Sequence, residues 1–315
     1  MSKRGAYRTK KAIKSQDLLF DLGINWMCLA FHVNQKSFSS TEIYFDYRTT
    51  ITEKDLVFAI NRAHERGVKV CLKPVINCSD GMWRALINFP DMNMFEEDCY
   101  WNEWFDHYSA FLCHYAEIAQ DTGCEMLCIG CEMSGTERKE KHWRDLIAKI
   151  RTIYQGPLVY NANHGREGDV AWFDAVDYIG TSAYYKVAKK PNVTKEDMIL
   201  SWRKVSEKMQ QLSKKFNKEV IFMEIGCRSA KGCAMMPWDF THKELPWSEE
   251  EQSDFYDSCL SVCHDEPWFA GAFWWDWSVE IYETTEEAKM DKGFNIHLKK
   301  AEQVLKEWYA IETLD

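Results

Sequence analysis

Short runs of apolar and β-branched residues alternate with stretches of helical length and periodicity along the whole chain. Strands that are separated by helices pair in parallel within one sheet, so this alternation predicts an α/β fold. We count eight strands that alternate with helices in the 315 residues, a number and a length typical of a (β/α)8 TIM barrel. No linker rich in Pro, Gly or Ser interrupts the alternation. We therefore expect a single barrel domain over residues 1–315.

A doubly wound parallel sheet is the competing α/β architecture. It usually has a glycine-rich phosphate loop after its first strand, whereas residues 30–34 contain no glycine, which favours the barrel. The predicted strands cover residues 24–32, 41–46 (a weak strand), 68–76, 126–132, 157–163, 176–184, 219–224 and 269–277. The predicted helices cover residues 52–66, 101–121, 139–153, 168–173, 195–216, a helix that begins at 248, and 297–309.

The charge of the chain excludes several classes of partner. The net charge is −10 at pH 7 and no basic stripe offsets it, so we expect neither nucleic acid nor an anionic membrane as a partner. No run of about 18 apolar residues indicates a transmembrane helix. The first residues are basic but lack the apolar core of a signal peptide, so we expect a cytoplasmic protein, with secretion as the alternative. No obligate protein partner is evident, and the sequence leaves the oligomeric state open.

The 12 cysteines raise the question of disulfides or metal binding. In a chain of this length without an export signal, we expect them to be reduced and mostly buried. Cys128 and Cys131 lie three apart on a predicted strand, so their side chains point to opposite faces and are poorly placed to share a metal. Cys259 and Cys263 share a face of a predicted helix, but no second cluster accompanies them. We expect neither a metal nor a cofactor.

Two of the predicted strands end in a glutamate that has a glycine two or three residues further on. Met126-Leu-Cys-Ile-Gly-Cys-Glu132 continues into Met-Ser-Gly, and Glu219-Val-Ile-Phe-Met-Glu224 continues into Ile-Gly. An ionised carboxylate is costly to bury without a partner, and catalytic groups of barrels lie at the C-terminal ends of strands. A pair of carboxylates at that end of a barrel is the minimum equipment for hydrolysing a glycosidic bond. Glu132 and Glu224 are therefore the candidate catalytic pair.

Four short motifs carry a resemblance to a known family: Ile129-Gly-Cys-Glu132, Phe222-Met-Glu-Ile-Gly226, Leu72-Lys-Pro74 and Phe273-Trp-Trp-Asp-Trp277. In their order and strand positions they resemble the clan of retaining (β/α)8 glycosidases. Within that clan the chain looks most like glycoside hydrolase family 113, the β-mannanase group, from about residue 23 to residue 309.

This resemblance implies an acid/base role for Glu132 and a nucleophile role for Glu224, with β-1,4-mannan or manno-oligosaccharides as the substrate. The sequence departs from the pattern of the wider clan at two positions. Cys131 stands where many relatives have an asparagine that bonds the sugar 2-hydroxyl, and Ser182 stands where an aspartate is expected.

Four polar residues at strand ends are candidates for substrate binding. Lys73 and Asn77 are in phase near the end of one predicted strand, and a lysine within an apolar run indicates a hydroxyl or carboxylate partner. Asn163 ends another strand and is a candidate donor to a sugar hydroxyl. Tyr184 resembles the tyrosine that bonds the nucleophile in this clan, with Tyr185 as the alternative.

The tryptophans of the last predicted strand are candidates for the floor of the sugar subsite, because the apolar face of a sugar stacks on indole rings. Trp275 and Trp277 share one face, and Trp274 and Asp276 share the other. We favour Trp275 and Trp277 as the floor. The rings of the other face are then expected to pack between strand and helix.

The sequence therefore predicts a retaining hydrolase of β-1,4-mannosidic bonds. A β-glucanase or another β-glycan hydrolase on the same barrel is one alternative, and a non-catalytic sugar-binding barrel or a metal-dependent hydrolase is another. Endo and exo action are both open. A wall across one end of the cleft, formed by residues 226–246 or 80–100, would favour exo cleavage.

Overall fold

The computed structural model describes residues 3–91 and 98–312. Within these residues the strands form one sheet in the order β2-β1-β3-β4-β5-β6-β7-β8. β1, β3, β4 and β5 are parallel, as are β7 and β8. The strands are β1 (Trp26–Gln35), β2 (Ile43–Tyr44), β3 (Lys69–Cys78), β4 (Met126–Cys131), β5 (Leu158–Asn163), β6 (Tyr178–Ser182), β7 (Val220–Ile225) and β8 (Phe269–Trp274).

Helices connect most of the consecutive strands. The α-helices are α1 (Lys10–Phe20), α2 (Glu53–Glu65), α3 (Cys99–Thr122), α4 (Glu140–Arg151), α5 (Lys195–Phe216), α6 (Glu249–Cys263), α7 (Thr285–Met290) and α8 (Lys300–Glu312). Short 3-10 turns are η1 (Ala6–Arg8), η2 (Arg84–Leu86), η3 (Glu167–Asp169), η4 (Phe173–Ala175) and η5 (Cys233–Met235). A mostly parallel eight-stranded sheet with connecting helices is the (β/α)8 architecture that the alternation predicts.

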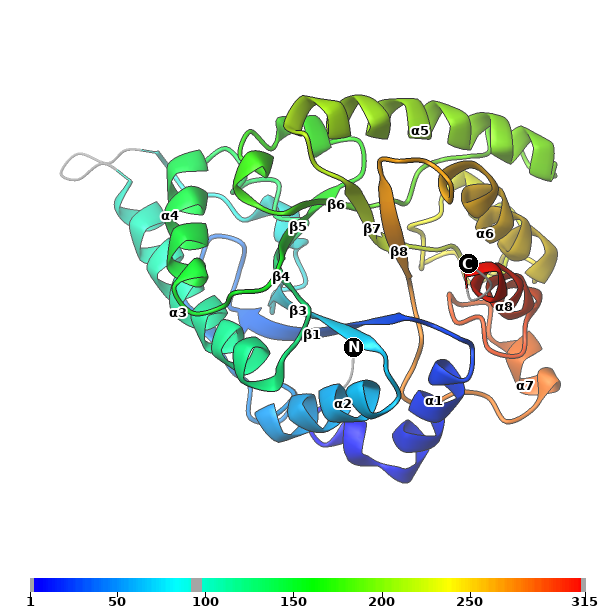
Figure 1. The fold of residues 1–315 in the computed structure, drawn as a ribbon, viewed down its shortest axis with the longest axis horizontal. Coiled ribbons are helices and arrows are strands. Elements are labelled where there is room, and N and C mark those ends of the chain that lie inside the picture. The colour runs from blue at the N-terminus through cyan, green and yellow to red at the C-terminus, as the bar shows by residue number, and fades with distance from the viewer. Residues whose placement is uncertain (1–2, 92–97, 313–315) are drawn as a thin grey trace. The chain divides into compact units, whose positions relative to one another are not determined.

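The chain divides into two compact units. The first unit comprises residues 1–9 and 26–180, and the second comprises residues 10–25 and 181–315. In the first, α2, α3 and α4 lie outside β1, β3, β4 and β5; in the second, α5, α6 and α8 lie outside β7 and β8 (Figure 1). The single domain over residues 1–315 stays a prediction.

Aromatic residues fill the core of the first unit. Trp104 and Tyr108 of α3 stack with ring centroids 4.8 Å apart and planes 10° from parallel. Trp143 of α4 stacks on Trp172 at 4.7 Å and 15°. All four rings are buried. Aromatic pairs of this kind contribute about 0.5–1.5 kcal/mol beyond the area that they bury. Trp143 also contacts Tyr160 of β5, with ring centroids 5.1 Å apart, which holds α4 against the strands of this unit.

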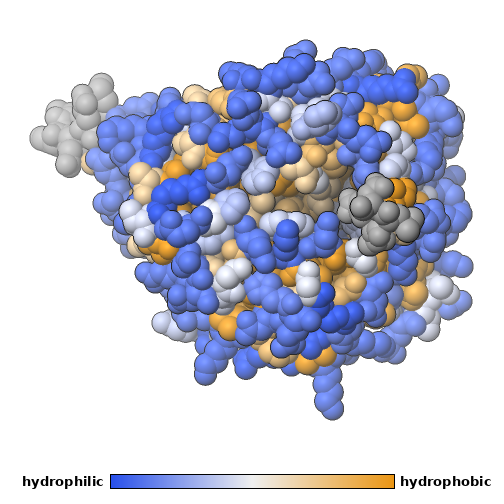
Figure 2. Space-filling view, viewed as in Figure 1, coloured by the Kyte–Doolittle hydropathy of each residue, from blue (hydrophilic) through white to orange (hydrophobic). Residues whose placement is uncertain are grey.

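The second unit has its own core. Phe222 of β7 contacts Trp202 of α5 and Trp268, with ring centroids 6.2 and 5.9 Å apart. Phe255 of α6 closes the cluster at 5.4 Å from Trp202. The opposite face of α5 presents hydrophilic residues, visible along the top of Figure 2. This division into an apolar and a polar face is what a helix that covers a sheet requires.

Several helix ends follow the signals in the sequence. Thr52 and Asp55 form a capping box at the start of α2. Thr194 caps α5 and Ser248 caps α6, each by accepting a backbone N–H with its hydroxyl. Gly123 ends α3 with a φ of 70°, a left-handed conformation that glycine adopts without strain.

The prediction of a weak parallel barrel strand over residues 41–46 was wrong. β2 has two residues and pairs antiparallel with the end of β1, Asn34 opposite Tyr44. The predicted helix at 168–173 is two 3-10 turns, η3 and η4. α1 was missed because two of its four buried positions are the polar residues Ser15 and Gln16, which hide the apolar period.

No helix among the described residues is both long and apolar enough to cross a membrane.

Candidate active site

Glu132 follows the last residue of β4 and has a left-handed backbone, with a φ of 53°. This conformation is uncommon for a residue with a side chain and costs free energy unless the surroundings impose it. The Glu132 N–H donates to the carbonyl of Asn161 on β5 at 2.7 Å. The bond continues the pairing of β4 with β5 and holds the backbone of Glu132 at the end of the strand.

The Glu132 carboxylate is bound by two neighbouring side chains of the β3–α3 connection. Arg84 Nη1 lies 3.0 Å from Glu132 Oε2, and Trp83 Nε1 donates to the same oxygen at 3.4 Å. Arg84 is fixed in turn, because its Nη2 donates to Asn77 Oδ1 at 2.7 Å and its Nε to the carbonyl of Ile76 at 2.9 Å. Both charged side chains are largely buried, 15% exposed for Arg84 and 12% for Glu132. The guanidinium therefore stabilises the ionised form of the glutamate.

Neither Arg84 nor Trp83 was among the residues predicted for the site. A signal was present, since a Trp-Arg pair lies a few residues beyond a strand end that already carries Asn77. Strand alternation does not extend into a loop, and it gave no direction for these two side chains.

The polar residues predicted in the first unit lie as follows. Asn77 contacts Arg84, and Asn163 Nδ2 donates to Ser134 Oγ at 2.9 Å and to the carbonyl of Glu132 at 3.4 Å. The structure thus gathers Asn77 and Asn163 around Glu132 and its arginine. Lys73 is 1% exposed within β3, where its Cα is in register with Ala30 of β1.

In the second unit Glu224 is the fifth residue of β7 and is partly buried. The carbonyl of Glu224 accepts from the Ala183 N–H at 2.6 Å, and Tyr184 donates its hydroxyl to Glu224 Oε2 at 3.2 Å. The Tyr185 hydroxyl instead contacts the sulfur of Met209 at 3.7 Å, and its ring lies against Trp202 and Phe222. Of the two candidate tyrosines, Tyr184 is therefore the one that touches this carboxylate.

The turn after Glu224 lies tightly against the end of β8. A Cβ at Gly226 would lie 2.3 Å from the carbonyl oxygen of Trp275, so only glycine fits there. The Trp275–Asp276 peptide bond is cis. Trp274 stacks on Tyr256 of α6, with ring centroids 4.2 Å apart and planes at 17°. This is the strand–helix packing that we expected for the face opposite Trp275 and Trp277.

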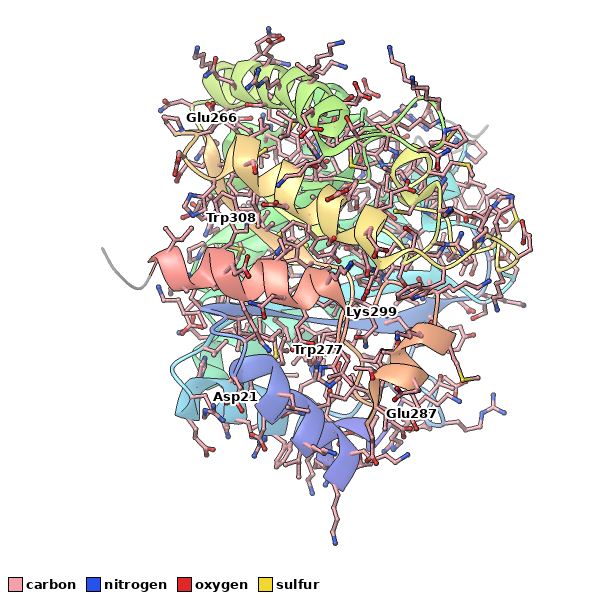
Figure 3. The ribbon with its side chains drawn as sticks, turned by 90° about the vertical axis from the view of Figure 1, so that its right-hand side faces the viewer. Asp21, Glu266, Trp277, Glu287, Lys299 and Trp308 are labelled. Atoms are coloured by element: carbon pink, nitrogen blue, oxygen red, sulfur yellow. The ribbon has the colours of Figure 1, made fainter. Side chains whose placement is uncertain are left out.

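Trp277 has a hydrogen-bond partner in α1. Its indole Nε1 donates to Ser15 Oγ at 3.0 Å and to the Ser15 carbonyl at 3.1 Å, and its ring contacts His297 with centroids 5.3 Å apart. Figure 3 shows Trp277 close to α1 and to the start of α8. The ring is fixed in place and remains partly exposed.

Arg228 lies in the loop after Glu224 and is 5% exposed. Its Nη2 pairs with Asp239 at 2.6 Å and its Nη1 donates to the carbonyl of His242 at 3.0 Å. The pair is buried, and it ties residues 226–246 into a fixed loop. Of the second loop proposed as a wall, residues 80–100, positions 92–97 lie outside the described residues.

None of the 12 cysteines forms a disulfide, and ten of them are buried. Within the described ranges, no group of three or more His, Cys, Asp or Glu side chains gathers in a metal-binding arrangement. The site residues include two carboxylates at strand ends: Glu132 lies beside Arg84, and Glu224 lies beside Tyr184. A carboxylate next to a cation or a phenol is suited to acid, base or nucleophilic chemistry.

Comparison with known proteins identifies the family of the chain. The model of Glycoside Hydrolase Family 113 matches residues 1–299. A β-mannanase of this family from Alicyclobacillus acidocaldarius in complex with ManMIm matches with a TM-score of 0.89 at 36% identity, over 98% of this chain and 94% of that one. A complex of a β-1,4-mannanase of the family matches with the same TM-score at 32% identity, over 98% and 96% of the two chains.

More distant structures share the fold. A β-D-glucuronidase of Dictyoglomus thermophilum matches with a TM-score of 0.61 at 16% identity, a level that bears on the fold alone. No curated protein sequence matches the chain. The family model covers most of the chain, and the β-mannanases match over nearly its full length. The chain therefore belongs to Glycoside Hydrolase Family 113 and is a glycoside hydrolase with a (β/α)8 fold.

Proposed function

We propose that this enzyme hydrolyses β-1,4-mannosidic bonds in mannan or manno-oligosaccharides by double displacement, with retention of anomeric configuration. Membership of a family whose matched structures are β-mannanases is the observation that carries the proposal. Glu224 is the nucleophile and Glu132 is the acid/base. Their positions at the ends of β7 and β4 support these roles, since barrel enzymes place catalytic groups at strand ends.

In the first step the Glu224 carboxylate attacks the anomeric carbon while Glu132 gives its proton to the departing glycosidic oxygen. The C–O bond to the leaving sugar breaks and a glycosyl ester of Glu224 forms. Tyr184 donates to Glu224 Oε2 at 3.2 Å and so orients the attacking carboxylate. When the ester forms, this carboxylate loses its negative charge, and the hydrogen bond to Tyr184 weakens.

In the second step Glu132, now ionised, takes a proton from water, and the water oxygen attacks the anomeric carbon. The ester bond breaks, Glu224 leaves as a carboxylate, and two inversions give net retention. Arg84, 3.0 Å from Glu132, stabilises the ionised form that this step requires. The same arginine opposes the protonated form that the first step requires, so it sets the balance between the two steps.

The remaining candidates bind the sugar. Asn77 and Asn163 belong to the hydrogen-bonded group around Glu132. When substrate binds, the side-chain amide of either residue can replace its present protein partner with a hydroxyl of the sugar. Lys73 contributes a buried ammonium from β3. Trp275 and Trp277 form the aromatic floor. Many relatives of the wider clan have asparagine where this chain has Cys131, so we propose that a contact with the 2-hydroxyl comes from another of these polar groups.

We propose a cytoplasmic location and soluble manno-oligosaccharides as the physiological substrate. Twelve cysteines that form no disulfide support this, because a reducing compartment keeps cysteines as thiols. Fractionation of the source cells with an antibody to the protein measures the location directly. Recovery of the protein from the culture medium would contradict it.

Incubation with mannohexaose, cellohexaose and xylohexaose, with products followed by chromatography, tests the substrate. Only mannohexaose is expected to be cleaved, and its product lengths report endo or exo action. Turnover confined to cellohexaose would make the enzyme a β-glucanase. NMR of the first product tests retention, because a β-anomer formed before mutarotation is required.

The catalytic roles are tested by Glu132→Gln and Glu224→Gln, which keep the side-chain volume and remove the acid. Each is expected to lower kcat by about 10²–10⁴-fold or more. Glu103→Gln, on the exposed face of α3, is the matched control and should keep full activity. Binding without turnover in the unmodified protein would instead indicate a sugar-binding barrel, and inhibition by chelators would indicate a metal enzyme.

A further inference from the structure

Glu137 is a buried acid that the proposed chemistry does not use. It lies between β4 and α4, it is 2% exposed, and one carboxylate oxygen, Oε1, accepts from the hydroxyl of Tyr160 at 2.8 Å. The other oxygen, Oε2, has no hydrogen-bond partner among the described residues. Burial raises the pKa of this carboxyl to about 7. A buried carboxyl group is costly to maintain, so its presence here requires an explanation.

Tyr160 is held rigidly in β5. Its ring is fully buried, with centroids 5.1 Å from Trp143 and 4.8 Å from Trp172. Both indoles are fixed as well, because Trp143 donates to the carbonyl of Thr136 at 3.1 Å and Trp172 to that of Glu137 at 3.0 Å. The phenol oxygen therefore has one position and little freedom to leave it.

The phenol oxygen connects Glu137 to the backbone of Glu132. Tyr160 donates its only hydroxyl hydrogen to Glu137, so a lone pair of the same oxygen is free to accept the Met133 N–H, which lies 3.3 Å away. The Met133 N–H belongs to the peptide that directly follows Glu132, whose φ is 53°. A Cβ on Gly130 would lie 2.7 Å from the Tyr160 ring, so the ring packs directly on the end of β4.

We propose that Tyr160 and Glu137 are positioning residues for the acid/base. Oriented by Glu137, the Tyr160 hydroxyl holds the peptide after Glu132 and so maintains the left-handed backbone that aims the Glu132 carboxylate at the glycosidic oxygen. This inference rests on the proposed acid/base role of Glu132. Without the acceptor on Glu137, the hydroxyl rotates and its lone pair no longer faces Met133.

A defect in the acid/base has a chemical signature that a general loss of stability lacks. A good leaving group departs without protonation, so a misplaced acid slows the cleavage of poor leaving groups far more than that of good ones. A misplaced base slows attack by water, whereas azide attacks the glycosyl ester without a base. Azide therefore restores turnover and yields a β-mannosyl azide.

Tyr160→Phe is tested on phenyl and 2,4-dinitrophenyl β-mannobioside, with and without azide. We expect a loss of about 10- to 100-fold in kcat/KM on the phenyl substrate and a much smaller loss on the dinitrophenyl substrate. We also expect azide to raise kcat on the dinitrophenyl substrate. Glu137→Leu should show the same pattern, and Glu137→Gln, which keeps an acceptor oxygen for Tyr160, should lose less than Glu137→Leu.

Tyr154→Phe is the matched control. It also removes a buried tyrosine hydroxyl of the first unit, but one that donates to Cys124 before the start of β4. It should lower the melting temperature and leave both leaving-group dependence and azide response as in the unmodified enzyme. If Tyr160→Phe does not fold, the two Glu137 variants carry the test.

Glu132→Ala, measured in parallel, separates two kinds of failure. If Glu132→Ala keeps its activity or does not respond to azide, the proposed function itself is wrong. If Glu132→Ala responds to azide but Tyr160→Phe and Glu137→Leu behave like Tyr154→Phe, the acid/base assignment stands and the positioning inference is overturned.

Discussion

Arg84 and Glu132 form an ion pair with 3.0 Å between Nη1 and Oε2, although 48 residues separate them in the chain. Both side chains are mostly shielded from water, so the interaction is screened less than a surface pair would be. An acid/base must be protonated in one half of the reaction and ionised in the other. Arg84 favours the ionised form of Glu132, so removing the arginine should change how the rate of the enzyme depends on pH.

Arg84→Met is expected to move the alkaline limb of the kcat/KM profile to higher pH, because the proton on Glu132 is no longer opposed by a neighbouring cation. Arg84→Lys keeps the charge but loses the fork that also binds Asn77 and the Ile76 carbonyl. It should shift the limb less. The measurement is the pH–rate profile on mannohexaose, and an unchanged alkaline limb in Arg84→Met would contradict the prediction.

Tyr184→Phe removes the hydroxyl that donates to Glu224 Oε2. The Glu224 carboxylate ionises less readily when it loses this hydrogen-bond donor, so the acid limb of the kcat/KM profile should move to higher pH. We expect kcat to fall about 10- to 100-fold, since the carboxylate also loses its orientation. Tyr185→Phe, whose hydroxyl contacts Met209, is the control and should leave the profile unchanged. Equal effects of the two variants would count against the prediction.

Glu137 makes stability depend on pH in a defined direction. Burial raises the pKa of its carboxyl to about 7, against opposing contributions from Tyr160 and Arg166, and with smaller raising contributions from Asp169 and Glu167. The folded protein therefore holds a proton between about pH 4.5 and 7 that the unfolded chain releases. The free energy of unfolding should fall as pH rises through this window, by up to about 3 kcal/mol, and level off above it.

Glu137→Gln removes the titrating group at nearly constant volume. Denaturant unfolding of both proteins at several pH values from 4.5 to 8 gives the comparison, and the difference in their free energies of unfolding isolates the contribution of Glu137. A difference that is independent of pH would show that this carboxyl does not titrate in the window.

Gly226→Ala introduces a Cβ 2.3 Å from the Trp275 carbonyl oxygen, a backbone atom that cannot rotate away. The end of β8 or the turn after Glu224 must move. We expect a loss of about 1–3 kcal/mol in stability and a lower kcat. Gly168→Ala is the control, because no atom lies within 4 Å of its added Cβ. The prediction fails if the melting temperatures and kcat values of the two variants agree.

Local patterns in the sequence were sufficient for much of the fold and for part of the site. Alternation placed Glu132 and Glu224 at strand ends, and the caps at Thr52 and Ser248 start α2 and α6 where the sequence indicated. These features depend on residues a few positions apart, and the same short-range rules act in the folded chain. Where the local pattern is weak the prediction fails: α1 was missed because polar residues at two of its buried positions interrupt the apolar period.

The contacts that make the carboxylates chemically different depend on tertiary structure. The sequence determined that two acids end two strands, but nothing local indicates that Arg84 binds Glu132, that Trp277 is anchored by Ser15, or that Tyr160 joins Glu137 to the backbone near Glu132. The partners in these contacts lie tens to hundreds of residues apart, and only the packing of strands and loops brings them within bonding distance. Side-chain periodicity gives the face on which a residue lies, whereas its hydrogen-bond partners are decided by the fold.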